Sequence, residues 1–262
     1  GIRESLKKRY DNYLARTQRN KSDDVFQIFM NAFAMSIEPH TNYLGRSASD
    51  DFDISMRLSL VGIGAVLQER DEYITIRELV AGGPAAKSGK LAVGDRIVGV
   101  GQADGSVSDV VGSRVDEVVK LIRGTKDTKV LLDILPAESG PDGKHKLISL
   151  VRDKIKLEEQ AAKKSVINVS EGAVQRKVGV ITLPTFYEDF EGRRRGDKEF
   201  RSASRDVVRL IDELKKEKVD GLLIDLRNNG GGSLREAVEL TGLFIDKGPL
   251  VQQRRPDGKI GV

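Results

Sequence analysis

The sequence predicts an α+β protein, because its residue pattern changes character twice along the chain. Apolar residues recur at helical spacing within residues 2–50, and short β-type runs separated by glycine fill residues 56–152. After residue 155, longer apolar runs flank an amphipathic stretch. A chain of 262 residues, 39% of them hydrophobic, is long enough to bury one or two cores. We therefore expect a helical region over 1–55, a β-rich domain over 56–152 and part of an α/β domain over 153–262.

The first region is predicted to be helical because five apolar residues share one face of a 3.6-residue repeat: Val25, Phe26, Phe29, Met30 and Phe33. Ser22 is the predicted N-cap, since a serine hydroxyl can accept a hydrogen bond from the first helical turn. Pro39 is expected to end the helical region, because the residue before a proline avoids the helical conformation.

The β-rich domain is predicted to alternate strands with two short helices. The strand candidates are Leu58–Gln68, Tyr73–Leu79, Arg96–Val100, Lys129–Leu135 and Lys146–Val151. The helices are expected near Pro84–Ser88 and Ser113–Arg123. The second of these begins with Ser113, and Asp116 three residues later suggests a capping box.

The last region predicts a parallel βαβ unit. Two apolar runs, Val178–Leu183 and Gly221–Leu226, are typical of strands that are buried on both faces, and a helix over Ser204–Lys218 is expected between them. A glycine-rich turn then leads into a helix over Ser233–Phe244, where Ser233 and Glu236 have the spacing of a full capping box.

Composition excludes several kinds of chemistry. The chain has no cysteine and only two histidines, His40 and His145, so we expect no metal site, no cofactor and no cysteine- or histidine-based catalysis. The net charge of +4 is accounted for by the first twenty residues, which contain six basic and two acidic side chains. Nucleic acid is therefore not an expected partner, because phosphate binding needs basic residues concentrated on one surface. No apolar run is long enough to span a bilayer.

A glycine-containing motif opens the β-rich domain. In Gly62-Ile63-Gly64-Ala65, successive backbone N–H groups can point into one concavity that suits a carboxylate, although an ordinary turn is the alternative. The motif is followed by AGGPAA (81–86) and VGDRIVGV (93–100), and in this order the three resemble a PDZ domain over residues 56–152.

The PDZ resemblance implies a peptide groove between the strand after Gly64 and the helix from Ser113. A peptide C-terminus would add to the strand, and its carboxylate would be bound by the N–H groups of Ile63, Gly64 and Ala65. Val118 and Ile122 would line the pocket for the last side chain, with Ile63 and Val66 opposite. Plain core packing is the alternative for these apolar residues.

The second motif is DLRNNGGG (225–232), which stands between a predicted buried strand and a predicted helix. Such a turn exposes N–H groups beside the positive end of a helix and can bind an anion, including the oxyanion of a tetrahedral intermediate. A tight turn that needs glycine only for clearance is the alternative.

The order of motifs along the chain resembles the carboxyl-terminal processing proteases, and most closely their bacterial tail-specific members. The motifs are EPHTNYL (38–44), the PDZ-like segment, VGVITLPTFY (178–187) and DLRNNGGG. The resemblance implies a crotonase-like catalytic core, a serine endopeptidase with a Ser–Lys dyad, and polypeptide C-termini as partners in the bacterial periplasm. It also implies that Gly231 or Gly232 supplies an oxyanion N–H, and the sequence leaves both candidates open.

The family places its nucleophilic serine and its lysine after the DLRNNGGG motif, and the sequence reaches Val262 before either. Ser202-Ala203-Ser204 is similar to the family's nucleophile motif, but it lies before DLRNNGGG and not after it. We therefore interpret Ser202 or Ser204 as a helix N-cap. The 262 residues by themselves are therefore expected to lack peptidase activity. A stand-alone PDZ module is the alternative hypothesis. A trypsin-like protease is disfavoured because a His…Asp…Ser domain is missing.

Overall fold

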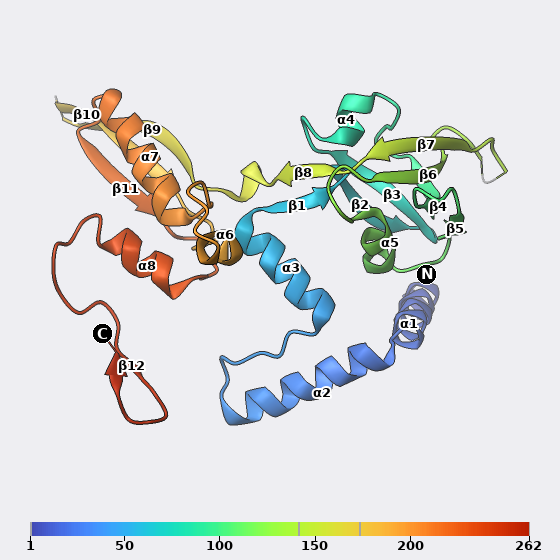
Figure 1. The fold of residues 1–262 in the computed structure, drawn as a ribbon, viewed down its shortest axis with the longest axis horizontal. Helices are drawn as coiled ribbons and strands as arrows, with labels where there is room; N and C mark the ends of the chain where they lie inside the picture. The colour runs from blue at the N-terminus through green and yellow to red at the C-terminus, as the bar shows by residue number, and fades with distance from the viewer. Residues whose placement is uncertain (1, 141, 173, 262) are drawn as a thin grey trace. The chain divides into compact units, whose positions relative to one another are not determined.

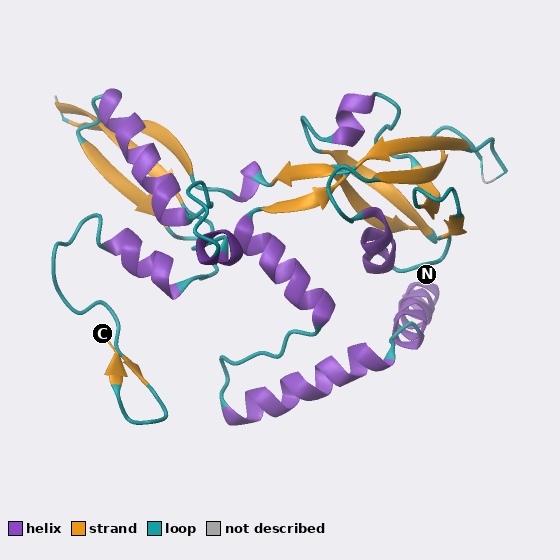
Figure 2. Cartoon of the chain, viewed as in Figure 1, coloured by secondary structure: helices purple, strands orange, loops and turns teal. Residues whose placement is uncertain are grey.

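The computed structural model describes residues 2–140, 142–172 and 174–261 and divides the chain into two compact units, 1–55 and 56–262. Helices and strands both contribute, so the α+β class is confirmed (Figure 2). Three helices begin the chain (Figure 1): α1 (Ile2–Gln18), α2 (Ser22–Ile37) and α3 (Arg46–Arg57). The two units are described separately below.

The helix predicted around Phe33 is confirmed as α2, but its N-cap is Lys21 and not Ser22. The carboxylate of Asp24 accepts the Lys21 N–H at 2.9 Å, so the first turn closes one residue earlier than expected. At the other end, Glu38 leaves the helical conformation with φ −149°, as its position before Pro39 predicts.

The segment after α2 is held to that helix by one asparagine. The Asn31 side chain donates to the Tyr43 carbonyl at 3.0 Å and accepts the Tyr43 N–H at 2.9 Å. The Tyr43 ring also packs edge-on against Phe26, with ring centroids 5.7 Å apart. Residues 38–43 thus return along α2. Within this segment His40 Nδ1 lies 2.7 Å from the Glu38 carboxylate, and this contact fits the expected role of His40 in fixing the loop.

The second unit begins with a β-rich part in which the sheet order is β2-β3-β4-β6-β7, with β5 paired to β4. The predicted strand Leu58–Gln68 is two strands, because the chain leaves extended conformation at Ile63 and Gly64, where Gly64 has φ +74°. The elements are β1 (Ser59–Gly62), β2 (Ala65–Arg70), β3 (Tyr73–Leu79), α4 (Pro84–Ser88), β4 (Arg96–Gly101), β5 (Val107–Asp109), α5 (Val115–Ile122), β6 (Lys129–Leu135) and β7 (Lys146–Val151).

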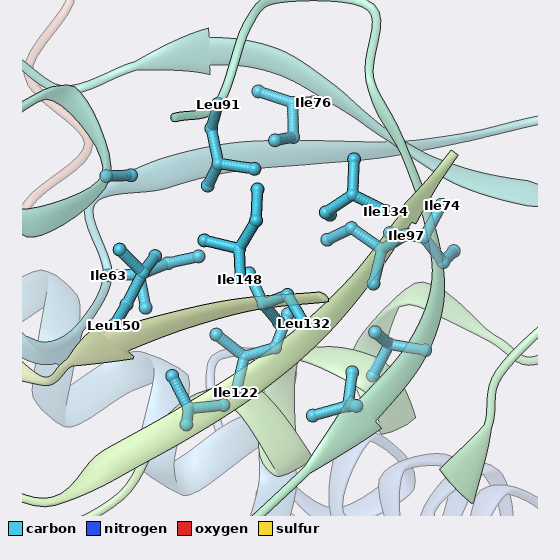
Figure 3. Packing of buried hydrophobic residues seen from close by; sticks show 14 of the residues in the cluster. Ile63, Ile74, Ile76, Leu91, Ile97, Ile122, Leu132, Ile134, Ile148 and Leu150 are labelled. Carbon is cyan, nitrogen blue, oxygen red and sulfur yellow. The ribbon is translucent and has the colours of Figure 1, made fainter. Parts of the chain in front are cut away.

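A single apolar core lies between this sheet and its helices. Figure 3 shows Ile63 and Ile122 among the buried members of this cluster, together with residues of β3, β4, β6 and β7. The predicted N-cap of α5 is not found at Ser113. Arg114 occupies the N-cap position, and its guanidinium contacts Asp116 at 3.0 Å, so Asp116 is engaged by a side chain.

Arg152 closes the C-terminal end of α5. It is 3% exposed and directly follows β7. Its guanidinium donates hydrogen bonds to three carbonyls and two side chains: Ile122 O (2.7 Å), Leu121 O (3.0 Å), Lys129 O (2.8 Å), Thr128 Oγ1 (3.0 Å) and Gln102 Oε1 (2.7 Å). Burial of the guanidinium lowers the pKa of Arg152. A helix end that would lack partners is thus satisfied by a residue thirty positions later.

A two-stranded ribbon follows Arg152, in which β8 (Asp153–Lys156) pairs antiparallel with β1. Beyond a 3₁₀ turn at Glu158–Gln160, a three-stranded sheet has the order β11-β10-β9. The remaining elements are β9 (Lys163–Glu171), β10 (Val174–Thr182), α6 (Phe190–Arg194), α7 (Ala203–Lys216), β11 (Gly221–Asp225), α8 (Leu234–Thr241), β12 (Gln253–Arg254) and β13 (Ile260–Gly261).

The predicted βαβ unit is confirmed, since β10 and β11 are parallel and α7 connects them. The expected burial on both faces is wrong for β11, which lies at the edge of the described sheet and leaves Leu223 50% exposed. The buried face of α7 joins the second core with Leu58 and the centrally placed Tyr187. The Tyr187 hydroxyl donates to Asp206 Oδ2 at 2.6 Å and accepts the Ala162 N–H at 3.3 Å. Burial raises the pKa of Tyr187, so this hydroxyl stays protonated at neutral pH.

Candidate anion-binding turn and peptide groove

The turn between β11 and α8 is organised by two of its own side chains. The Asp225 carboxylate accepts from Arg227 Nε at 3.0 Å and Nη2 at 2.8 Å, and this hydrogen bonding lowers the pKa of Asp225 to about 2. Asn229 accepts the Gly231 N–H at 2.7 Å and donates to the Leu183 carbonyl at 2.9 Å. Asn229 therefore fixes the first half of the glycine run to the end of β10.

The second half of the turn is attached to residues 184–186. Four hydrogen bonds make this connection: Gly230 N–H to Pro184 O (3.2 Å), Phe186 N–H to Gly231 O (2.8 Å), Thr185 Oγ1 to Gly231 O (2.8 Å) and Ser233 N–H to Phe186 O (2.8 Å). The turn is therefore held on both sides, by its own Asn229 and by a segment about 45 residues earlier.

These hydrogen bonds distinguish the two glycines that the sequence left open. The Gly231 N–H is occupied by Asn229. Gly232 is exposed, has φ +135°, and within the described chain its N–H has no recorded acceptor. It lies two residues before the first residue of α8, where the helix dipole favours negative charge. Of the two glycines, Gly232 is therefore the one whose N–H remains available as a donor.

Ser233 is the N-cap of α8, as predicted, but the full capping box with Glu236 is wrong. The Ser233 hydroxyl accepts the Glu236 N–H at 3.4 Å, whereas the Glu236 carboxylate does not return to Ser233. Glu236 is fully buried, and it accepts the Ser204 N–H at 2.7 Å and faces Arg193 Nη2 at 3.0 Å. The contacts to Arg193 and Ser204 replace the capping box, because a buried carboxylate needs a cation and a strong hydrogen-bond donor.

The serines of Ser202-Ala203-Ser204 are structural. Ser202 is the N-cap of α7 and is buried, and its Oγ accepts the Arg205 N–H at 3.5 Å. Ser204, also buried, contacts Glu236 and Glu239. The N-cap interpretation is thus confirmed for Ser202.

The loop between β1 and β2 carries the predicted carboxylate-binding residues. The carbonyls of Ile63 and Gly64 accept the N–H groups of Ala85 at 2.8 Å and Val80 at 2.9 Å. In the residues that the structure describes, no acceptor is recorded for the N–H of Ile63 or of Gly64. Ala65 is the first residue of β2 and pairs with Leu79. The loop therefore presents two adjacent free donors.

The predicted groove residues are brought together only in part. Ile63, Val118 and Ile122 are buried in one core cluster. Ala65, Leu67 and Val115 are partly exposed and pack against that cluster, whereas Val66 lies outside it. Side chains alternate along a strand, so the face of β2 that meets α5 carries Ala65 and Leu67 in place of Val66.

The position of β2 in the sheet leaves one of its edges available. Among the described residues β2 pairs only with β3, and α5 contacts both β2 and β4 (Figure 1). An edge strand beside a helix is the geometry in which a peptide adds as a further strand.

The described residues were also compared with the requirements of a metal site and of a membrane-spanning helix. Among residues 2–140, 142–172 and 174–261, no cluster of His, Asp and Glu side chains could hold a metal ion. His145 lies alone with Asp133 at 3.0 Å. Within the same described ranges, none of the helices combines the length and hydrophobicity required to cross a bilayer.

Comparison with known families matches three consecutive parts of the chain. Residues 1–47 match the tail specific protease N-terminal domain, residues 52–135 the PDZ domain, and residues 177–261 the peptidase family S41. The fold and the glycine turn thus define a PDZ-containing segment of S41 peptidases. The chain thus carries, in this order, the N-terminal, PDZ and S41 segments, and it is similar to tail-specific and carboxy-terminal processing proteases.

The individual relatives point to the tail-specific branch. The tail-specific protease of Haemophilus influenzae is 45% identical over 253 residues, which are 97% of this chain and 34% of that protein. The carboxy-terminal processing protease CtpA of Bacillus subtilis is 31% identical over 216 residues, 82% of this chain and 40% of that protein. The chain therefore spans between a third and two fifths of the length of these relatives.

A solved structure also matches the β-rich part. It is the PDZ domain of the carboxy-terminal protease from Vibrio cholerae in complex with peptide, with 59% identity and a TM-score of 0.37. The match covers 38% of this chain and all of that one.

Proposed function

We propose that this chain is the substrate-recognising portion of a serine endopeptidase that binds apolar polypeptide C-termini and processes or degrades the proteins that carry them. The observation that carries the proposal is the order of the three matched families, with a PDZ domain directly before an S41 segment in one chain. The stand-alone PDZ module is disfavoured by the S41 match over residues 177–261. We also propose that the protein acts in the bacterial periplasm, as its similarity to a bacterial tail-specific protease suggests.

Recognition would use the loop and the edge strand described above. The terminal carboxylate would accept the free N–H groups of Ile63 and Gly64, with Ala65 at the start of the strand the third expected donor. The peptide backbone would add to β2, which has a free edge in the described structure. Val118 and Ile122 would form the floor of the pocket for the last side chain, and the half-exposed Val115 would contribute to its wall.

Cleavage would place the scissile carbonyl at the glycine turn. The N–H of Gly232 would donate to the oxyanion that develops in the transition state, while Gly231, the other candidate, holds the turn through Asn229. The serine nucleophile and the lysine base are proposed to come from parts of the protein outside this sequence. The lysine must be neutral to act as a base, which requires burial or a cationic neighbour.

Calorimetry with paired peptides tests the recognition step. A peptide ending in small apolar residues should bind the chain, and the same peptide with an amidated C-terminus should bind at least tenfold more weakly, since the amide removes the charge that the loop N–H groups bind. Equal affinity of the two peptides would contradict carboxylate recognition. The protease role is tested separately with the full-length protein, which should cleave a substrate with this C-terminus.

A further inference from the structure

We propose that Glu188 is a positioning residue for the oxyanion donor at Gly232 and that it acts through the hydroxyl of Ser233. The proposal rests on the proposed protease function, because it concerns the geometry of that site. Glu188 is 2% exposed, although carboxylates are seldom buried without a structural or functional reason. It directly follows the VGVITLPTFY motif (178–187) and belongs to none of the motifs named above.

The link between Glu188 and the glycine turn is direct. Ser233 Oγ donates to Glu188 Oε2 at 2.5 Å, and the Ser233 N–H donates to the Phe186 carbonyl at 2.8 Å. Ser233 is thus held by its side chain and by its backbone to two residues of the same short segment. The Ser233 N–H lies in the peptide plane between Gly232 and Ser233, so these two hydrogen bonds restrain the C-terminal side of Gly232. The adjoining plane, which carries the Gly232 N–H, is held through Gly231 O by the Phe186 N–H and Thr185 Oγ1, each at 2.8 Å.

Glu188 also has partners in its own segment and in Arg193. Arg193 Nε lies 2.8 Å from Glu188 Oε1, and the backbone of Glu188 forms an antiparallel bridge with Ser202. Arg193 in turn contacts Glu236 at 3.0 Å and Glu239 at 2.8 Å. Its hydrogen bonds to Glu239 raise the pKa of Arg193, so the guanidinium remains charged.

The contacts of Glu188 with Arg193 and Ser233 are better explained by orientation of the turn than by stabilisation of the fold. A buried ion pair contributes little net stability, because desolvation of the charges offsets most of their attraction. An oxyanion donor is effective only when it is held close to its productive position, and errors near 1 Å reduce rates by about a hundredfold.

Steady-state kinetics of the full-length protease that contains this segment test the proposal. Glu188→Ala should lower kcat at least tenfold, with KM and the affinity for a C-terminal peptide unchanged, because the groove lies in another part of the chain. Glu188→Gln keeps an acceptor for the Ser233 hydroxyl and should restore most of the lost kcat. Glu191→Ala is the matched control, because Glu191 is exposed and contacts only Arg194 and Arg195.

A second readout uses the 262-residue chain and needs no activity. The backbone amide resonance of Gly232 should shift in Glu188→Ala and in Ser233→Ala, and the double variant should shift no further than either single one. In Glu191→Ala it should stay in place. An unmoved Gly232 resonance, or a Glu188→Ala enzyme with kcat within twofold of the parent, would overturn the positioning role. A full-length wild-type protein that cleaves nothing would instead contradict the proposed function, while the resonance test would still decide the Glu188–Ser233 link.

Discussion

The carbonyl oxygen of Phe186 occupies the space that a Cβ on residue 232 would need. An ideal Cβ there would overlap that oxygen and lie 2.8 Å from the Phe186 carbonyl carbon. Gly232 also has φ +135°, a conformation that side-chain-bearing residues rarely adopt. Two independent constraints, one steric and one conformational, thus require glycine at this position.

Gly232→Ala is expected to destabilise the unit over residues 56–262. The free energy of unfolding should fall by about 2–4 kcal/mol, because the strained φ and the overlap with Phe186 must both be relieved by moving the turn. Gly230→Ala is the matched control. A Cβ at Gly230 meets nothing within 4 Å and its φ is not positive, so the expected loss is below about 1 kcal/mol. Chemical denaturation of both variants makes the measurement, and equal losses would contradict the steric argument.

Arg152→Met is expected to loosen the β-rich part of the second unit. The substitution leaves the carbonyls of Leu121, Ile122 and Lys129 without their buried donor, so we expect a loss of about 3 kcal/mol in the free energy of unfolding. Lys154→Met, on the exposed side of β8, is the control and should change stability by less than about 0.5 kcal/mol. Faster hydrogen exchange at the end of α5 in the Arg152 variant alone would locate the effect. Unchanged exchange there would contradict the capping role.

Asp225 should titrate near pH 2 in the folded protein, because Arg227 stabilises its charged form. The usual aspartate pKa in an unfolded chain is about 3.9. The stabilising contribution is therefore complete above about pH 4 and is lost as the pH falls through the folded value near 2. The carboxyl ¹³C shift of Asp225 measures this directly. In Arg227→Gln the midpoint should rise toward the ordinary value, and a wild-type midpoint already near 4 would contradict the ion pair.

The affinity for an apolar C-terminal peptide should fall on substitution of Val115 and should not change on substitution of Val66. Val115→Ala removes two methyl groups from a half-exposed side chain beside the core cluster, which should weaken binding of an apolar C-terminal peptide by about 1 kcal/mol, or fivefold. Val66→Ala lies outside that cluster and should leave the affinity unchanged. Calorimetry of both variants with one peptide makes the comparison. A larger loss at Val66 would place the groove on the other face of β2.

The sequence correctly predicted the strands whose signal is a local pattern of apolar residues. The bounds predicted for Tyr73–Leu79, Lys129–Leu135 and Lys146–Val151 agree with β3, β6 and β7. These runs are bounded by turn residues and alternate or concentrate apolar side chains, so burial can be inferred from the spacing alone. The strand β9 was not predicted, because its apolar residues Val166, Ile167 and Val169 do not alternate regularly with the polar residues around them.

The sequence also predicted the candidate turn, but it did not predict that Gly231 and Gly232 have different hydrogen bonding. In the sequence alone, two adjacent glycines cannot be distinguished as donors. They differ only because Asn229 accepts the N–H of Gly231, while the Phe186 carbonyl fills the space beside Gly232. Similarly, Glu236 had the spacing of a capping residue, and only packing against Arg193 and Ser204 shows that its carboxylate is used elsewhere.

By itself the sequence determined the α+β class, most strands of the β-rich part, the βαβ unit and the absence of cysteine chemistry, since each depends on composition or on a period of two to four residues. The tertiary structure alone decided which glycine keeps a free N–H, where Arg152 ends α5, and how Glu188 meets Ser233. The Arg152 and Glu188 contacts join residues 30 and 45 positions apart, and the glycine turn combines the Asn229–Gly231 hydrogen bond with contacts to residues 184–186. Such pairings follow from the free energy of packing the whole unit, and no local spacing records them.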